Sequence, residues 1–173
     1  MKIIDGLLAE LEQEAETTRR VLERIPQAHL SWKPHLKSMS LGQLALHVAT
    51  VPGNVAELAA MDTIAAPPNF VQPEAATASE LMPSLTESVA KAKRALGGFD
   101  DARMGAMWRL QSGGKDIMAM PRVAFVRAIM LNHWYHHRGQ LLVYLRMHNV
   151  PLPSVYGPTA DENPFMAVNS VSA

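Results

Sequence analysis

Apolar residues recur at steps of three and four along four stretches of the chain, a spacing that places them on one face of an α-helix. The stretches span residues 4–25, 40–58, 79–96 and 121–147. The opposite face of the first stretch carries charged residues, among them Glu10, Arg19 and Glu23. The pattern therefore predicts four amphipathic helices, each with one face available for a shared core.

Proline and capping residues mark where these helices begin or are interrupted. Ser40 is a favourable N-cap residue for the second helix. Thr77 with Glu80 and Ser84 with Glu87 both resemble capping boxes. Pro83 favours a start of the third helix near Ser79, because the proline then lies in the first turn or just past it. Pro52 lies inside the second helical pattern, where it removes one backbone hydrogen bond, so we expect a kink at that point.

The helical rhythm breaks between the third and fourth helices. Two short apolar segments within residues 107–120 flank Ser112-Gly113-Gly114-Lys115, which indicates a β-hairpin with a glycine turn. Residues 151–173 are rich in proline and should form a loop and tail. The predicted fold is all-α. It is a four-helix bundle with long inter-helix connections and a small β-hairpin before the last helix, in one domain over residues 1–173.

Composition limits the partners and the compartment. The 16 basic and 16 acidic residues cancel, whereas phosphate binding needs a surplus of lysine and arginine, so no nucleic-acid partner is expected. No apolar run approaches the roughly 20 residues that cross a bilayer, and the N-terminus lacks a signal-peptide pattern, so we expect a cytoplasmic protein with no membrane partner. Because cysteine is absent, disulfides, thiolate-ligated zinc and a cysteine nucleophile are excluded.

Candidate chemistry is concentrated in the fourth helix. His133 and His137 are four residues apart, so their imidazoles point the same way and can hold one divalent metal ion. Two ligands leave a metal under-coordinated, and His47, on the apolar pattern of the second helix, is the best candidate for a third. We expect zinc or nickel, with iron, cobalt and manganese as alternatives. Three protein ligands would leave one coordination position open.

Each histidine also has a structural interpretation, because a lone histidine on an apolar face is more often a hydrogen-bonded core residue than a ligand. His136 lies about 100° around the helix from His137, so we expect it to support the ligands or to contact another helix rather than to bind metal. For Arg138 and Gln140, a tie to the C-terminal loop is favoured over support of the ligands. Asn54 lies on nearly the same face as His47 and can line a pocket.

Longer motifs strengthen the metal-site interpretation. Towards the C-terminus the chain contains Asn132-His133, His136-His137-Arg138-Gly139-Gln140-Leu141, Val150-Pro151-Leu152-Pro153 and Tyr156-Gly157-Pro158. Nearer the N-terminus it contains Ser31-Trp32-Lys33-Pro34 and Ser40-Leu41-Gly42-Gln43-Leu44-Ala45-Leu46-His47. Together these blocks resemble the two signatures of the DinB family.

The resemblance implies a four-helix bundle, often a homodimer, with a divalent metal held by His47, His133 and His137. Related proteins include transferases and isomerases that use a small-molecule thiol as cosubstrate. The resemblance therefore suggests a metal-dependent thiol S-transferase acting on an electrophilic substrate. A non-catalytic metal-binding stress protein and a metal-assisted hydrolase are the alternatives. No residue is selected as general acid or base, although Glu57, Asp161 and Glu162 are candidates.

Overall fold

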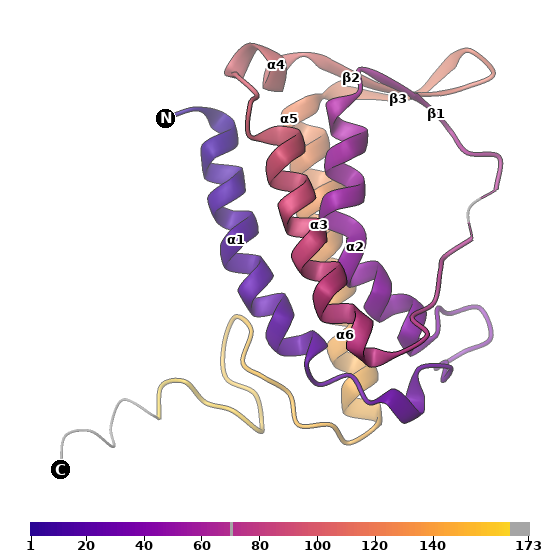
Figure 1. Cartoon of the computed structure of the whole chain (residues 1–173), viewed down its shortest axis with the longest axis vertical. Coiled ribbons are helices and arrows are strands. Elements are labelled where there is room, and N and C mark those ends of the chain that lie inside the picture. The colour runs from indigo at the N-terminus through magenta and orange to yellow at the C-terminus, as the bar shows by residue number, and fades with distance from the viewer. Residues whose placement is uncertain (70, 167–173) are drawn as a thin grey trace.

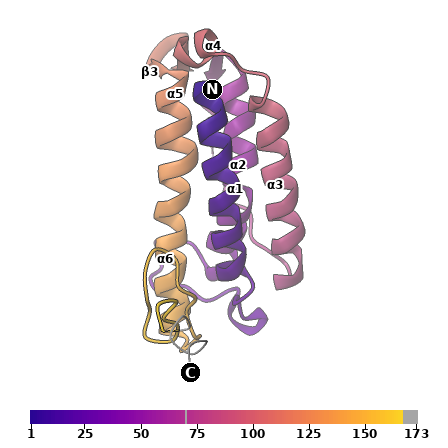
Figure 2. The ribbon, with the colours of Figure 1, turned by 90° about the vertical axis from the view of Figure 1, so that its left-hand side faces the viewer.

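The computed structural model describes residues 1–69 and 71–166, and Figure 1 shows their arrangement. Its α-helices are α1 (Ile3–Leu22), α2 (Leu41–Ala60), α3 (Leu81–Leu96), the short α4 (Asp101–Gly105), α5 (Arg122–Phe125) and α6 (His133–Met147). Short 3₁₀ turns occur at Gln27–His29 and Ala78–Glu80. Helices α1, α2, α3 and the column formed by α5 and α6 lie lengthwise beside one another, which confirms the predicted four-helix bundle (Figure 2).

The start of α2 follows the capping chemistry of its sequence. The Ser40 hydroxyl accepts from the Gln43 backbone N–H at 3.0 Å, and the Gln43 side chain accepts from the Ser40 N–H at 2.9 Å. These reciprocal bonds satisfy two amides that a helix N-terminus otherwise leaves without partners. The predicted capping box of Thr77 and Glu80 is also present, at the 3₁₀ turn that leads into α3.

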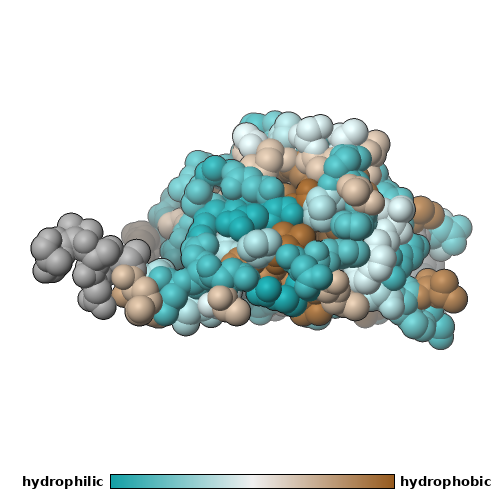
Figure 3. Space-filling view, turned by 90° about the horizontal axis from the view of Figure 1, so that it is seen from below, coloured by the Kyte–Doolittle hydropathy of each residue, from teal (hydrophilic) through white to brown (hydrophobic). Residues whose placement is uncertain are grey.

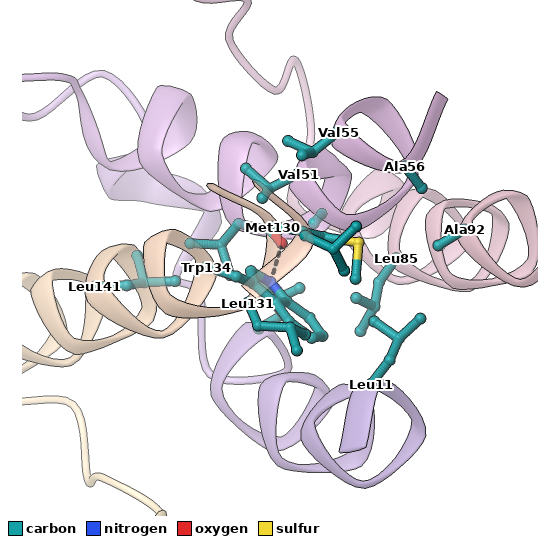
Figure 4. Close-up of a cluster of buried hydrophobic side chains, with 14 of the residues drawn as sticks. Leu11, Val51, Val55, Ala56, Leu85, Ala92, Met130, Leu131, Trp134 and Leu141 are labelled. Atoms are coloured by element: carbon teal, nitrogen blue, oxygen red, sulfur yellow. Dashed lines mark hydrogen bonds between the residues drawn. The ribbon is translucent and has the colours of Figure 1, made fainter. Parts of the chain in front are cut away.

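Pro52 does not end α2, because neighbouring helices satisfy the backbone groups around it. Proline lacks the N–H that would bond to the Val48 carbonyl four residues earlier. That carbonyl instead accepts from the Trp134 indole at 2.7 Å, the bond drawn in Figure 4. The Gly53 N–H donates to the Ser88 hydroxyl of α3 at 2.8 Å. Helix α2 therefore continues through the proline with partners from two other helices.

The contact between α2 and α3 depends on the absence of a side chain at Gly53. A Cβ there would lie 2.8 Å from the Ser88 carbonyl oxygen and 2.9 Å from the Ser88 Cα. Gly53→Ala should therefore force the helices apart and destabilise the protein by roughly 1–3 kcal/mol, the usual cost of overpacking. Urea denaturation measures this loss.

Gly139→Ala is the matched control for Gly53→Ala. A Cβ at Gly139, in the exposed face of α6, would meet no atom within 4 Å. Alanine should then stabilise the helix by about 0.5–1 kcal/mol through its higher helix propensity. If Gly53→Ala were as stable as the wild type, the close approach of α2 and α3 would not constrain the fold.

The last helical column is not α-helical throughout. Between α5 and α6, Val126–Asn132 form a π-helix, in which each turn takes up more residues than an α-turn. Positions four apart therefore stay on one face, and the buried line runs through Val126, Met130, Trp134 and Arg138. The predicted apolar stripe instead passed through the histidines. In the structure His133 and His137 are half-buried beside the core rather than at its centre.

A small sheet covers one end of the bundle (Figures 1 and 2). Strands β2 (Met107–Ser112) and β3 (Lys115–Pro121) pair antiparallel, and Gly113 and Gly114 adopt positive φ in the turn, as the predicted hairpin requires. Strand β1 (Thr63–Ala65) pairs parallel with β2. Neither β1 nor α4 was predicted, because segments of three and five residues are too short to show a period.

Arg122 joins this sheet end to the helices. Its guanidinium is fully buried and donates to the carbonyl oxygens of Ala59 at 2.6 Å, Met61 at 3.2 Å and Arg103 at 2.7 Å. It also pairs with the Asp62 carboxylate at 2.5 Å. Two of these carbonyls belong to the C-terminal end of α2, where a positive charge is favourable. A buried cation thus caps α2 and fixes the start of α5.

Residues 151–166 contain neither helix nor strand, as predicted, and the remainder of the predicted tail, residues 167–173, lies outside the described residues. The loop is tied to the bundle through Arg138, whose guanidinium donates to the Tyr156 hydroxyl at 2.6 Å. The lower end of the molecule, seen in Figure 3, is mainly hydrophilic with a small hydrophobic area at its centre. Within residues 1–69 and 71–166, no helix combines the length and apolar character that crossing a bilayer requires.

Candidate metal centre

The structure brings His47, His133 and His137 together. The ring centroid of His137 lies 4.5 Å from that of His47 and 4.5 Å from that of His133. The ring centroids of His47 and His133 are 5.2 Å apart. Each residue offers one ring nitrogen, and these nitrogens all lie within 4.8 Å of one another. The three side chains come from two helices, α2 and α6, and form a cluster that can hold a metal ion.

Hydrogen bonds orient two of the three rings. The Nδ1 of His133 lies 3.2 Å from the Ile129 carbonyl oxygen, and the Nδ1 of His137 lies 2.8 Å from the Gln140 Oε1. Because both oxygens accept, each Nδ1 is assigned the ring proton and each Nε2 carries a lone pair. The two Nε2 atoms are 2.8 Å apart. This is the arrangement by which a protein fixes the tautomer of a histidine that binds metal.

These contacts decide between the two roles considered for Arg138 and Gln140. Arg138 reaches Tyr156 in the C-terminal loop, so the predicted tie is confirmed for that residue. Gln140 instead contacts the His137 ring, the role that the sequence did not favour. His136 is exposed and stands outside the triad, with its ring centroid 5.0 Å from that of His137.

Burial keeps the triad in its neutral form. It lowers the pKa of His47 to about 4, with charge repulsion from His137 and His133 as further causes. Burial is also the main cause that lowers the pKa of His133 and of His137. Neutral imidazole is the form that binds a divalent ion, so the rings are ready for coordination at pH 7.

Acidification should therefore destabilise the metal-free protein. The pKa of His47 is about 6.5 in an unfolded chain and about 4 in the folded one. As the pH falls between these values the unfolded state takes up the proton first. The free energy of unfolding then falls by on the order of 1–2 kcal/mol, a figure that allows for solvent screening at this half-buried ring. Urea denaturation at about pH 7 and about pH 4.5 measures the loss.

His47→Gln is the control for this pH dependence, because glutamine does not titrate. The variant should lose less stability than the wild type over the same interval. The hydrogen bond from Arg127 holds the pKa of Glu10 below its usual value. Protonation of such carboxylates therefore weakens the fold mainly at lower pH. An equal loss in both proteins would assign the pH dependence to other groups, namely His133, His137 or such carboxylates, rather than to His47.

A cavity of about 320 Å³ adjoins the triad, and His47 and His133 form part of its wall. Its other described lining residues are Thr50, Val51, Asn54, Val55, Leu58, Gln72 and Pro73. The pocket position expected for Asn54 is confirmed. Gln72 and Pro73 come from the connection that runs from β1 to α3 alongside α2 in Figure 1, and no sequence pattern marks either as a pocket residue.

Comparison with known proteins places this chain in a family. The family model described as "DinB family" matches residues 2–164. The chain belongs to the DinB family. A DinB-like protein from Bacillus cereus ATCC 10987 superimposes with a TM-score of 0.68 at 22% identity, covering 88% of this chain and 97% of that one. The DinB-like protein YjoA from Bacillus subtilis gives a TM-score of 0.65 at 20% identity, covering 87% and 96%.

One curated relative extends the comparison in sequence. The uncharacterized protein YrdA of Bacillus subtilis (strain 168) is 23% identical over 168 residues, which cover 92% of this chain and 91% of that protein. At these identities the DinB-like structures establish the fold of the chain. They leave its chemistry to be inferred from its own residues.

Proposed function

We propose that this DinB-family protein binds a divalent metal ion through His47, His133 and His137. The convergence of three neutral ring nitrogens from α2 and α6 carries this proposal. Two of the rings present Nε2 because their Nδ1 atoms are engaged by the Ile129 carbonyl and by Gln140. The donor set fits zinc or nickel, and also iron, cobalt or manganese.

We further propose that the centre serves a transferase that uses a small-molecule thiol on an electrophilic substrate. A divalent ion with three protein ligands supplies an open position where the pKa of a thiol or water molecule is lowered. The cavity beside His47 and His133 gives the second reactant a place to bind. Because the chain has no cysteine, the sulfur nucleophile would come from the cosubstrate. The thiol would lose its proton to solvent, and its sulfur would form a bond to the electrophilic carbon while that carbon's bond to the leaving group breaks and the leaving group departs with the electron pair.

Metal analysis and a thiol-conjugation assay test the two steps separately. The purified protein should contain close to one metal ion per chain, and its melting temperature should rise when metal is restored to the stripped protein. The loaded protein should then accelerate conjugation of small thiols to electrophiles. Metal binding without turnover across a broad panel would favour a non-catalytic metal-binding protein. Turnover of esters or amides without a thiol would favour a hydrolase.

We also propose that the protein forms a homodimer through the outer faces of its first and last helices. Ile3 of α1 and Val143 and Met147 of α6 are exposed apolar residues that a partner would cover. A symmetric interface should bury more than roughly 1,000 Å² in total. Sedimentation equilibrium at micromolar concentration should give twice the chain mass of 19.0 kDa. A mass near that of one chain would contradict the proposal.

A further inference from the structure

The cavity beside the three histidines has a neutral lining. Of the lining residues that the structure describes, none carries a formal charge at pH 7. Most of the wall is apolar and comes from Val51, Val55, Leu58 and Pro73. An ionised group placed against these side chains would lose hydration without gaining a partner of opposite charge.

The polar side chains of the lining are suited to neutral hydrogen-bonding groups. The Thr50 hydroxyl donates to the Leu46 carbonyl at 2.8 Å, so it offers the pocket a lone pair rather than a proton. Asn54 and Gln72 each end in a primary amide, which can donate and accept at once. A ligand edge that carries both a donor and an acceptor, such as a carboxamide, complements this set.

The charged side chains that line an adjoining cavity are paired within the protein. A second cavity of about 350 Å³ shares Thr50 and Asn54 with the first and adds Lys91 and Glu87 along the groove between α2 and α3. Lys91 pairs with Glu57 at 3.2 Å, and Glu87 pairs with Arg94 at 2.6 Å. Both charges are thus compensated within the protein, and neither is left to attract an ion into the pocket.

We propose that the pocket beside His47 and His133 takes a small, uncharged, mostly apolar molecule with a carboxamide-like polar edge. The assignment rests on the proposed function, in which this pocket holds the reactant beside the metal. Only the atom that faces the ion would then carry negative charge, and the rest of the ligand would be neutral. Thiols or electrophiles that place a carboxylate or ammonium group against the apolar wall, away from the ion, would be disfavoured.

Three ligands of nearly equal shape test the charge preference: benzamide, benzoate and benzylammonium. The metal-free protein is used, so that benzoate cannot bind through the ion. Titrations followed by NMR at the Val51 and Val55 methyl groups should show benzamide binding at least about 10-fold more tightly than either charged ligand. Equal or tighter binding of a charged ligand would overturn the proposal. So would an absence of benzamide binding at millimolar concentration.

Asn54→Asp provides a matched test in the pocket wall, because it adds a negative charge with little change in volume. The variant should bind benzylammonium at least about 10-fold more tightly than the wild type and benzamide more weakly. Asn163→Asp adds the same charge in the exposed C-terminal loop, and should leave the order of the three ligands unchanged. Equal shifts in both variants would assign the effect to overall charge and overturn the pocket assignment.

A parallel zinc titration separates this inference from the proposed function. Zinc binding without a preference for benzamide would refute the neutral pocket alone. A preference for benzamide without zinc binding would refute the metal centre alone, and the neutral pocket would then stand as a binding site without a metal.

Discussion

His137→Ala is expected to lower the affinity for a divalent metal ion by more than about 100-fold and to remove any metal-dependent activity. Loss of residues that merely support a ligand typically costs 10–100-fold in affinity, so loss of a ligand itself should cost more. The variant also breaks the pair of Nε2 atoms that His133 and His137 present 2.8 Å apart on α6. Competition with a chromophoric chelator, together with elemental analysis of the purified variant, measures the change.

His136→Ala is the matched control on the same helix. The His136 side chain is exposed and lies outside the triad, so this change should alter metal affinity by less than about 3-fold. A similar loss of metal in both variants would mean that the wrong face of α6 has been assigned to the metal. Full retention of metal by His137→Ala would remove His137 from the proposed centre.

Arg138→Met should destabilise the protein by about 3–5 kcal/mol, because it removes one partner of a buried ion pair. Arg138 and Glu14 are both almost completely buried, and their charged groups lie 2.6 Å apart. The same guanidinium donates to the Thr18 hydroxyl at 3.0 Å and to the Tyr156 hydroxyl at 2.6 Å. The variant would leave the Glu14 carboxylate buried without a cation. Urea denaturation measures the loss.

Two further variants show whether the buried charge is the cause. Glu14→Gln combined with Arg138→Met should be less destabilising than Arg138→Met alone, because no unpaired charge remains. Arg127→Met breaks the more exposed pair with Glu10 and should cost less than about 1 kcal/mol. If the double variant were the least stable, packing rather than charge would explain the role of Arg138.

The features that could be predicted from the sequence depend on local spacing or on one residue type. Ser40 marks the start of α2 because its hydroxyl caps a helix, and the two glycines of the hairpin mark a turn that needs positive φ. The sequence predicts that His133 and His137 face the same way, because four residues make slightly more than one full turn of helix. His47 is a candidate third ligand because of its apolar surroundings and the family resemblance.

The features that could not be predicted depend on partners distant in the chain. The π-helical segment shifts the buried face from His133 and His137 to Trp134 and Arg138. A regular repeat of 3.6 residues does not predict that shift. Gln72 reaches the pocket from a long connection with no regular pattern. Arg122 looks like a surface residue in sequence, and only the carbonyls that converge on it explain its burial.

The backbone hydrogen bond that Pro52 removes from α2 has a consequence for the geometry of the candidate metal centre. The carbonyl that the proline leaves without its usual partner belongs to Val48, and the indole that takes its place belongs to Trp134. These residues directly follow His47 and His133 in the chain. A hydrogen bond between the two helices thus lies beside His47 and His133, and it helps to hold these two candidate ligands at their separation. A substitution that restored a regular amide at position 52 would compete with the indole for the Val48 carbonyl. It would loosen the contact between α6 and α2 while strengthening α2 itself.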